Sequence, residues 1–206
     1  MGGAARLAER DRLRVLVVYA HPLETSFIAA VHVRIVDALR AAGHEVDDLD
    51  LYAERFDPVL SPEQMRSYVD PSKNTREVEP YVERLSAAEA LVLVFPVWFD
   101  GLPAIMQGYF QRVFVPGVAT VIDANGLFHP NLWNLKRLAA VCAYGESRSA
   151  VAKNLDPPRR FVRDNIGVLI DPDGRLDYHA LYDMNFSKAP RRAAFLRSVE
   201  RAFSAW

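Results

Sequence analysis

Three short, almost wholly apolar runs constrain the fold of this chain most strongly. They are Val15–Ala20, Ala90–Phe95 and Leu138–Ala143, and none has an alternating polar face. Runs of this kind are typical of strands that are buried on both faces in the middle of a parallel sheet. Segments with apolar residues at helical spacing separate them along the chain. The sequence therefore predicts an α/β fold with a doubly wound parallel sheet and helices on both faces.

Two weaker patterns complete the expected sheet. We interpret His44–Leu51 as a second strand at or near an edge, and Leu176–Tyr182 as the last strand. Five strands fit the order 2-1-3-4-5 better than a six-stranded dinucleotide-binding sheet. We expect loops in the Pro-rich stretch 53–81 and at Val118–Lys136. The expected helices are Phe27–Ala42, Glu79–Ala88, Pro103–Phe114, Asp156–Ile170 and one that Ser187 caps and that ends near Phe203, with a short helix starting at Ser61.

The composition limits the classes of protein to consider. A chain of 206 residues that is 50% hydrophobic is long enough for one sizeable domain, which we place at residues 13–206 after a disordered tail at 1–12. The net charge of -1 argues against a nucleic-acid partner. The single cysteine excludes an intrachain disulfide and a cysteine-cluster metal site. The N-terminal residues lack a signal-peptide pattern and no apolar run is long enough to span a membrane, so we expect a cytoplasmic protein. We also expect no bound metal.

The end of the first strand has the features of an anion site. His21 and Pro22 end the apolar run, and Thr25 or Ser26 precedes the first helical segment as its N-cap. The free N–H groups of a helix N-terminus and the helix dipole favour a phosphate at this position. The alternative is an ordinary helix cap, with His21 as a polar residue that closes the strand.

Three strand ends are expected to meet at one edge of the sheet. They carry residues 21–27, Pro96–Pro103 and 143–148. Trp98, Phe99 and Tyr144 add aromatic groups beside the phosphate site, although each could instead pack in the core. A phosphate site next to aromatic walls suits a flavin nucleotide. The chain contains no GxGxxG, GxxxxGK[ST] or GxSxG pattern, which argues against a Rossmann-type nicotinamide site, a P-loop and an α/β-hydrolase.

At this point four segments resemble a known family. They are VVYAHPLETSF, DLYAERFDPVLS, FPVWFDGLPAIMQGYFQRVFVPGVA and AYGESR. Together they are similar to the flavodoxin-like NAD(P)H:quinone oxidoreductases, which include DT-diaphorase and shorter bacterial relatives. The resemblance implies a flavodoxin-like fold, bound FAD or FMN, a homodimer, and hydride transfer from NAD(P)H to a quinone or similar acceptor by a ping-pong cycle. The apolar helix face of Ile105–Phe114 also favours a dimer.

The resemblance also implies roles for individual residues. The flavin phosphates would lie against His21, Thr25, Ser26 and Phe27, and the flavin ring along Pro96, Val97, Trp98 and Phe99, with Tyr144 and Gly145 closing its other side. A Tyr–His pair assists hydride transfer in some relatives, and Tyr144 and His129 are the candidates here. Tyr144 is thus the candidate catalytic residue. We interpret Cys142 as a small buried hydrophobe rather than a redox thiol.

The chain departs from the family pattern at five positions. Relatives often have polar or small residues where this chain has Ile28, Val97, Cys142, Ala143 and Glu146. The first four changes remove polar groups near the expected flavin, and Glu146 adds a negative charge. The alternative function is therefore a non-catalytic flavodoxin-like regulatory or accessory subunit with a degenerate flavin site. A third alternative, an electron carrier like the flavodoxins, fits less well because those proteins are usually strongly acidic.

Overall fold

The chain folds around one five-stranded parallel sheet. In this computed structural model, which describes residues 12–206, the strand order is β2-β1-β3-β6-β7. Numbered along the sheet-forming strands alone, this is the predicted order 2-1-3-4-5, so the predicted fold class is confirmed. All of the predicted tail except Arg12 lies outside the described residues. The sheet consists of β1 (Arg14–Tyr19), β2 (Glu45–Asp50), β3 (Ala90–Val97), β6 (Arg137–Tyr144) and β7 (Arg175–Leu181).

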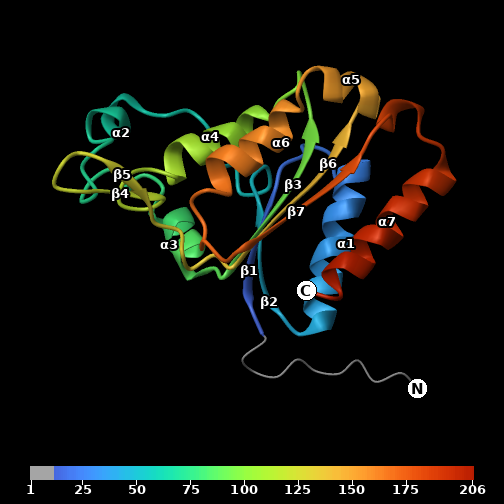
Figure 1. Cartoon of the computed structure of the whole chain (residues 1–206), viewed down its shortest axis with the longest axis horizontal. Coiled ribbons are helices and arrows are strands. Elements are labelled where there is room, and N and C mark those ends of the chain that lie inside the picture. Colours follow the sequence, from blue (N-terminus) through green and yellow to red (C-terminus); the bar gives the residue numbers. More distant parts are fainter. Residues whose placement is uncertain (1–11) are drawn as a thin grey trace.

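Helices cover both faces of the sheet (Figure 1). On one face α1 and α7 lie against each other and bury every second residue of the central strands, such as Val15 and Val92. On the other face α4 packs on the alternate residues, such as Leu16 and Leu91. This two-sided burial explains why the central strands have no polar face. The helices are α1 (Phe27–Ala42), α2 (Pro62–Arg66), α3 (Glu79–Ala87), α4 (Ala104–Val113), α5 (Arg148–Lys153), α6 (Pro157–Phe161), the π-helical turn η2 (Val162–Ile166), the 3-10 turn η3 (Met184–Phe186) and α7 (Ala189–Phe203).

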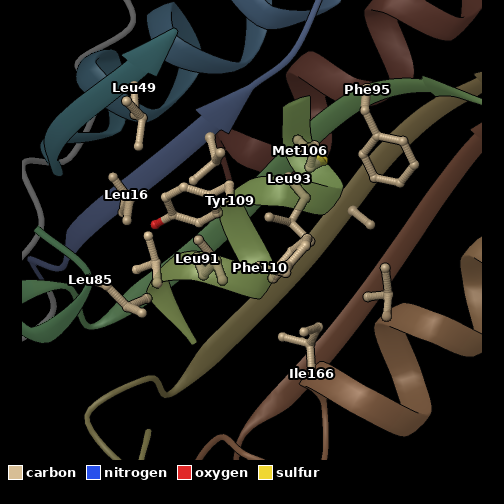
Figure 2. Packing of buried hydrophobic residues seen from close by; sticks show 14 of the residues in the cluster. Leu16, Leu49, Leu85, Leu91, Leu93, Phe95, Met106, Tyr109, Phe110 and Ile166 are labelled. Atoms are coloured by element: carbon tan, nitrogen blue, oxygen red, sulfur yellow. The ribbon is translucent and has the colours of Figure 1, made fainter. Parts of the chain in front are cut away.

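The apolar face of α4 belongs to the interior of the subunit itself. Figure 2 shows Met106, Tyr109 and Phe110 close to the side chains of β3. The buried residues of α4 are at most 8% exposed. This corrects our interpretation of Ile105–Phe114 as a surface for a second subunit, because the same residues are needed to cover the sheet.

Strand β3 is longer than predicted, because Pro96 does not end it. Pro96 and Val97 pair with Ala143 and Tyr144 of β6. On its other side β3 pairs with β1 only as far as Val94, whose carbonyl accepts the N–H of Ala20 at 3.0 Å. Pro96 lies two residues further along β3, so its backbone nitrogen and carbonyl point to the same side of the strand as those of Val94. The missing N–H of the proline therefore interrupts no ladder, and its carbonyl has no strand partner there.

Four local expectations were wrong. The predicted loop at Val118–Lys136 contains a hairpin of β4 (Thr120–Ile122) and β5 (Phe128–Pro130), and α5 was not predicted. The predicted helix at Asp156–Ile170 is divided into α6 and η2. Each of these elements is shorter than the window over which periodicity can be recognised. Ser187 does not cap α7, since Lys188 occupies that position and the Ser187 hydroxyl is buried without a partner.

Within residues 12–206 we find no helix that combines the length and the apolar character required to cross a bilayer.

Candidate functional site

A cavity of about 450 Å³ opens where β1, β3 and β6 end. Its location agrees with the general rule that ligands of open parallel sheets bind beyond the carboxyl ends of the strands. The lining residues come from the last residues of β3 and β6, the loops after the three strands, the start of α1 and the segment after β7. They are His21, Ser26, Phe27, Ile28, Pro96, Val97, Trp98, Phe99, Ala143, Gly145, Met184 and Asn185.

The N-terminus of α1 forms one side of this cavity. Ser26 is the N-cap, and its hydroxyl accepts a hydrogen bond of 3.0 Å from the Ala29 N–H. This decides between the two predicted caps, Thr25 and Ser26. The N–H groups of Phe27 and Ile28 precede the first intrahelical bonds and are available to a ligand. Thr25 does not line this cavity but borders a shallower hollow further along α1.

His21 is held in a neutral form beside the cavity. Its Nδ1 accepts a hydrogen bond of 3.0 Å from the Leu23 N–H, so the ring proton lies on Nε2. Burial lowers the pKa of His21 and so favours the neutral ring. The His21 ring lies 5.6 Å from the Trp98 ring, between their centroids. The imidazole can therefore donate one hydrogen bond while it supports the indole.

A tight turn after β3 presents the two aromatic residues. Trp98 and Gly101 exchange two main-chain hydrogen bonds, of 3.1 and 2.9 Å. The two residues between them, Phe99 and Asp100, have φ angles of 49° and 54°, which residues other than glycine rarely adopt. Trp98 is 42% exposed and the Phe99 side chain is fully exposed. Strained backbone and exposed aromatic rings at a cavity are features of ligand sites.

Tyr144 does not reach the cavity with its side chain. The ring is buried on the α4 side of the sheet, and its hydroxyl bonds to Asp156 at 2.5 Å and to Tyr178 at 2.6 Å. Burial raises the pKa of the Tyr144 hydroxyl well above its usual value. Cys142 lies in the same network, 3.3 Å from the Tyr178 hydroxyl, and burial raises the pKa of its thiol to about 12. The complete burial of Cys142 agrees with its interpretation as a small buried hydrophobe.

Gly145 lines the cavity, as expected, although Tyr144 beside it does not. A Cβ atom at Gly145 would lie 3.0 Å from the Asn185 amide nitrogen, so the glycine keeps this wall open. His129 lies on the exposed hairpin, where it bonds to Asp123 at 2.9 Å, and it does not line the cavity. Glu146 is exposed and also does not line it.

Two lining residues, Met184 and Asn185, were not predicted. They lie in the 3-10 turn after β7. Extending the strand-end rule by one strand, from β6 to β7, would have pointed to this segment.

Comparison with known proteins places the chain in a family. The model of a family described as having a flavodoxin-like fold matches residues 13–164, which is more than half of the chain. The chain belongs to this flavodoxin-like family. The predicted resemblance is therefore confirmed, and two named oxidoreductases are among the curated relatives of the chain.

These flavodoxin-like relatives match only part of the chain. NAD(P)H dehydrogenase (quinone) 1 of Rattus norvegicus is 33% identical over 122 residues, which cover 52% of this chain and 44% of the relative. An uncharacterized NAD(P)H oxidoreductase of Escherichia coli is 35% identical over 111 residues, covering 52% of this chain and 55% of the relative. The chain thus spans about half the length of the curated relatives it matches.

A solved flavodoxin-like structure matches nearly the whole chain. The crystal structure of Smu.1420 from Streptococcus mutans is 25% identical, with a TM-score of 0.82, and the match covers 94% of this chain and 100% of that one.

Proposed function

We propose that the protein is a flavin-dependent oxidoreductase that takes hydride from NAD(P)H and passes it to a quinone or similar acceptor. One observation carries the proposal: a single cavity joins the N-terminus of α1 to Trp98, Phe99 and Gly145. The names of the two curated relatives, an NAD(P)H dehydrogenase (quinone) and an NAD(P)H oxidoreductase, support the same reaction class.

The lining residues fit a flavin nucleotide. The cavity volume of about 450 Å³ lies within the range of small-molecule sites. The N–H groups of Phe27 and Ile28 and the positive end of the α1 dipole favour the phosphate. The exposed Trp98 and Phe99 rings add aromatic surface, and Ala143 and Gly145 line the same cavity with little or no side chain. A bound flavin would supply the hydride chemistry.

The residues around the cavity then place the flavin and keep its surroundings apolar. His21 donates from Nε2 to an acceptor, which suits an oxygen of the phosphate or the ribityl chain. The Pro96 carbonyl, which has no ladder partner toward β1, would be free to accept a hydrogen bond from an N–H of the flavin ring. Ile28, Val97 and Ala143 add apolar contacts where relatives often have polar groups. Thr25 stays in the proposal only as a neighbour of the phosphate site.

Nicotinamide and acceptor would bind by turns on the same exposed face beside Trp98 and Phe99. Such alternate binding predicts a ping-pong pattern, visible as parallel lines in double-reciprocal plots. The proposed cofactor is FMN or FAD. The mass of the cofactor released from the purified protein identifies which of the two is bound.

We further propose that the protein acts as a homodimer in the cytoplasm. Figure 1 shows α2 and the β4–β5 hairpin at the same end of the molecule. Both segments carry exposed apolar side chains, namely Met65 and Val69 in and after α2, and Leu127 and Phe128 in the hairpin. Exposed apolar patches mark interaction surfaces. Sedimentation at micromolar concentration should show a dimer, and Phe128→Asp should shift it toward the monomer.

The alternative of a non-catalytic accessory subunit rests on the apolar lining at Ile28, Val97 and Ala143. A yellow protein that NADH or NADPH bleaches, and that a quinone then reoxidises, supports the enzyme. A protein that binds flavin but is bleached by neither nucleotide supports the accessory subunit instead.

A further inference from the structure

A second cavity, of about 420 Å³, contains four arginines. It lies against α5, α6 and β7, and its lining extends from Leu176 near the start of β7 to Tyr182 just after the end of this strand. Arg148 comes from α5, Arg159 and Arg160 from α6, and Arg163 from η2. The only carboxylate among its lining residues is Asp156, which bonds to the Tyr144 hydroxyl.

The positive charge of this arginine cavity is only partly neutralised. Arg160 and Arg163 share Asp164, at 3.7 and 2.6 Å. Arg148 and Arg159 form no ion pair with any residue in the described range 12–206. The Arg159 guanidinium instead lies over the Tyr178 ring, 5.3 Å from its centroid. The whole chain has a net charge of -1, so the cationic surplus here is local.

The arginine cavity is a neighbour of the cavity at the ends of β1, β3 and β6, which we call the flavin cavity. Gly145 lines the flavin cavity and Arg148 lines the arginine cavity. Three residues of extended chain span at most roughly 11 Å. Tyr182 and Met184, also only two residues apart, line the arginine cavity and the flavin cavity respectively. Figure 1 shows α5 at the same end of the sheet as the tips of β3 and β6. One long ligand can therefore contact both.

We infer that the arginine cavity binds the 2′-phosphate of NADPH and makes NADPH the preferred reductant. Guanidinium groups form paired, charge-assisted hydrogen bonds with phosphate oxygens. Tyr182 and Leu155 provide an aromatic and an apolar surface for the adenine. NADH lacks this phosphate, so the arginines discriminate between the two nucleotides. The inference rests on the proposed function, since it assigns the substrate of that same reaction.

Binding of nucleotide fragments tests the inference directly. Calorimetry compares 2′,5′-ADP with 5′-AMP, which differ by the 2′-phosphate, on the wild type, Arg148→Ala and Arg159→Gln. We expect 2′,5′-ADP to bind at least tenfold tighter to the wild type, and each substitution to weaken it about tenfold. The control is Arg197→Ala on α7, at the opposite face of the sheet, which should bind like the wild type. Arg148 is exposed at the start of α5, so its removal leaves the core intact.

Equal affinity for the two fragments would overturn the inference. So would competition by inorganic phosphate at the same concentration as 2′,5′-ADP, because the site would then hold any small anion. The ratio of kcat/KM for NADPH to that for NADH separates this inference from the proposed function. A ratio near one with quinone reduction intact removes only the inference. Tight 2′,5′-ADP binding without oxidation of either nucleotide would keep the phosphate site but remove the proposed reaction, and with it the role of NADPH as reductant.

Discussion

The Asn154 side-chain amide donates a hydrogen bond of 2.7 Å to the Asp100 carboxylate. The bond joins the end of α5 to the turn that carries Trp98 and Phe99, which is 54 residues earlier in the chain. Asp100 has a positive φ angle, so its conformation needs support from outside the turn. The position of the aromatic wall therefore depends on α5, an element that forms part of the arginine cavity.

Removal of this bond should loosen the aromatic wall. We expect Asn154→Ala to weaken flavin binding by about 1 kcal/mol, or roughly fivefold, with little change in Tm. Asn165→Ala on η2, where the side chain is exposed, is the matched control and should bind flavin normally. Titration of the apo-protein with flavin, followed by fluorescence quenching, measures both. Unchanged affinity in Asn154→Ala would show that the turn holds its shape alone.

Two substitutions at Ser26 separate its capping role from its ligand role. Ser26→Ala removes the bond to the Ala29 N–H and should cost about 1 kcal/mol of folding free energy. Ser26→Asp keeps a good cap but places a carboxylate where the phosphate is proposed. We expect near-wild-type stability and at least tenfold weaker flavin binding from Ser26→Asp, because like charges repel.

Ser61 provides the control for that experiment. Its hydroxyl caps α2 by accepting from the Gln64 N–H at 2.9 Å, and it does not line the flavin cavity. Ser61→Ala should lower stability without changing flavin affinity. If Ser26→Asp retained flavin as well as the wild type, the phosphate would have to lie elsewhere.

We expect the Tyr144 hydroxyl to stabilise the folded protein and to take no part in hydride transfer. Tyr144→Phe removes the bonds to Asp156 and Tyr178 and should lower the free energy of unfolding by about 1–3 kcal/mol. We expect kcat to stay within about threefold of the wild type, since the ring does not line the cavity. A loss of kcat of a hundredfold or more in a flavin-saturated variant would restore Tyr144 as a catalytic residue.

Stability should fall between pH 7 and pH 5 because buried histidines are neutral in the folded state. Burial, reinforced by the nearby Arg137 charge, lowers the pKa of His44, which is 5% exposed. The unfolded chain takes up a proton near its ordinary pKa of about 6.5, so this contribution is present above that pH and is lost as the pH falls. Urea unfolding at pH 7.5 and pH 5 should show a smaller difference for His44→Gln. An equal difference would assign the effect to other groups.

Sequence patterns predicted the sheet well because burial on both faces of a strand leaves a clear signal. They failed to predict which residues line the cavity, because this depends on which face of the sheet each side chain occupies. Ala143 and Tyr144 are neighbours in β6, and because side chains alternate, only Ala143 faces the flavin cavity. The alternation of side chains along β6 could be predicted from the sequence. The face of the sheet on which the cavity lies could not. The arginine cavity could not be predicted, because its residues come from short elements whose packing only the structure shows.

The identity of the bound cofactor tests the central claim most directly. The purified protein is denatured, the released small molecules are identified by mass, and the absorbance of the native protein is followed as NADPH is added. We predict one FMN or FAD per chain and bleaching of its absorbance by the nucleotide. A colourless protein that releases no flavin, and that takes up neither FMN nor FAD when these are added, would contradict the assignment of the cavity at the ends of β1, β3 and β6.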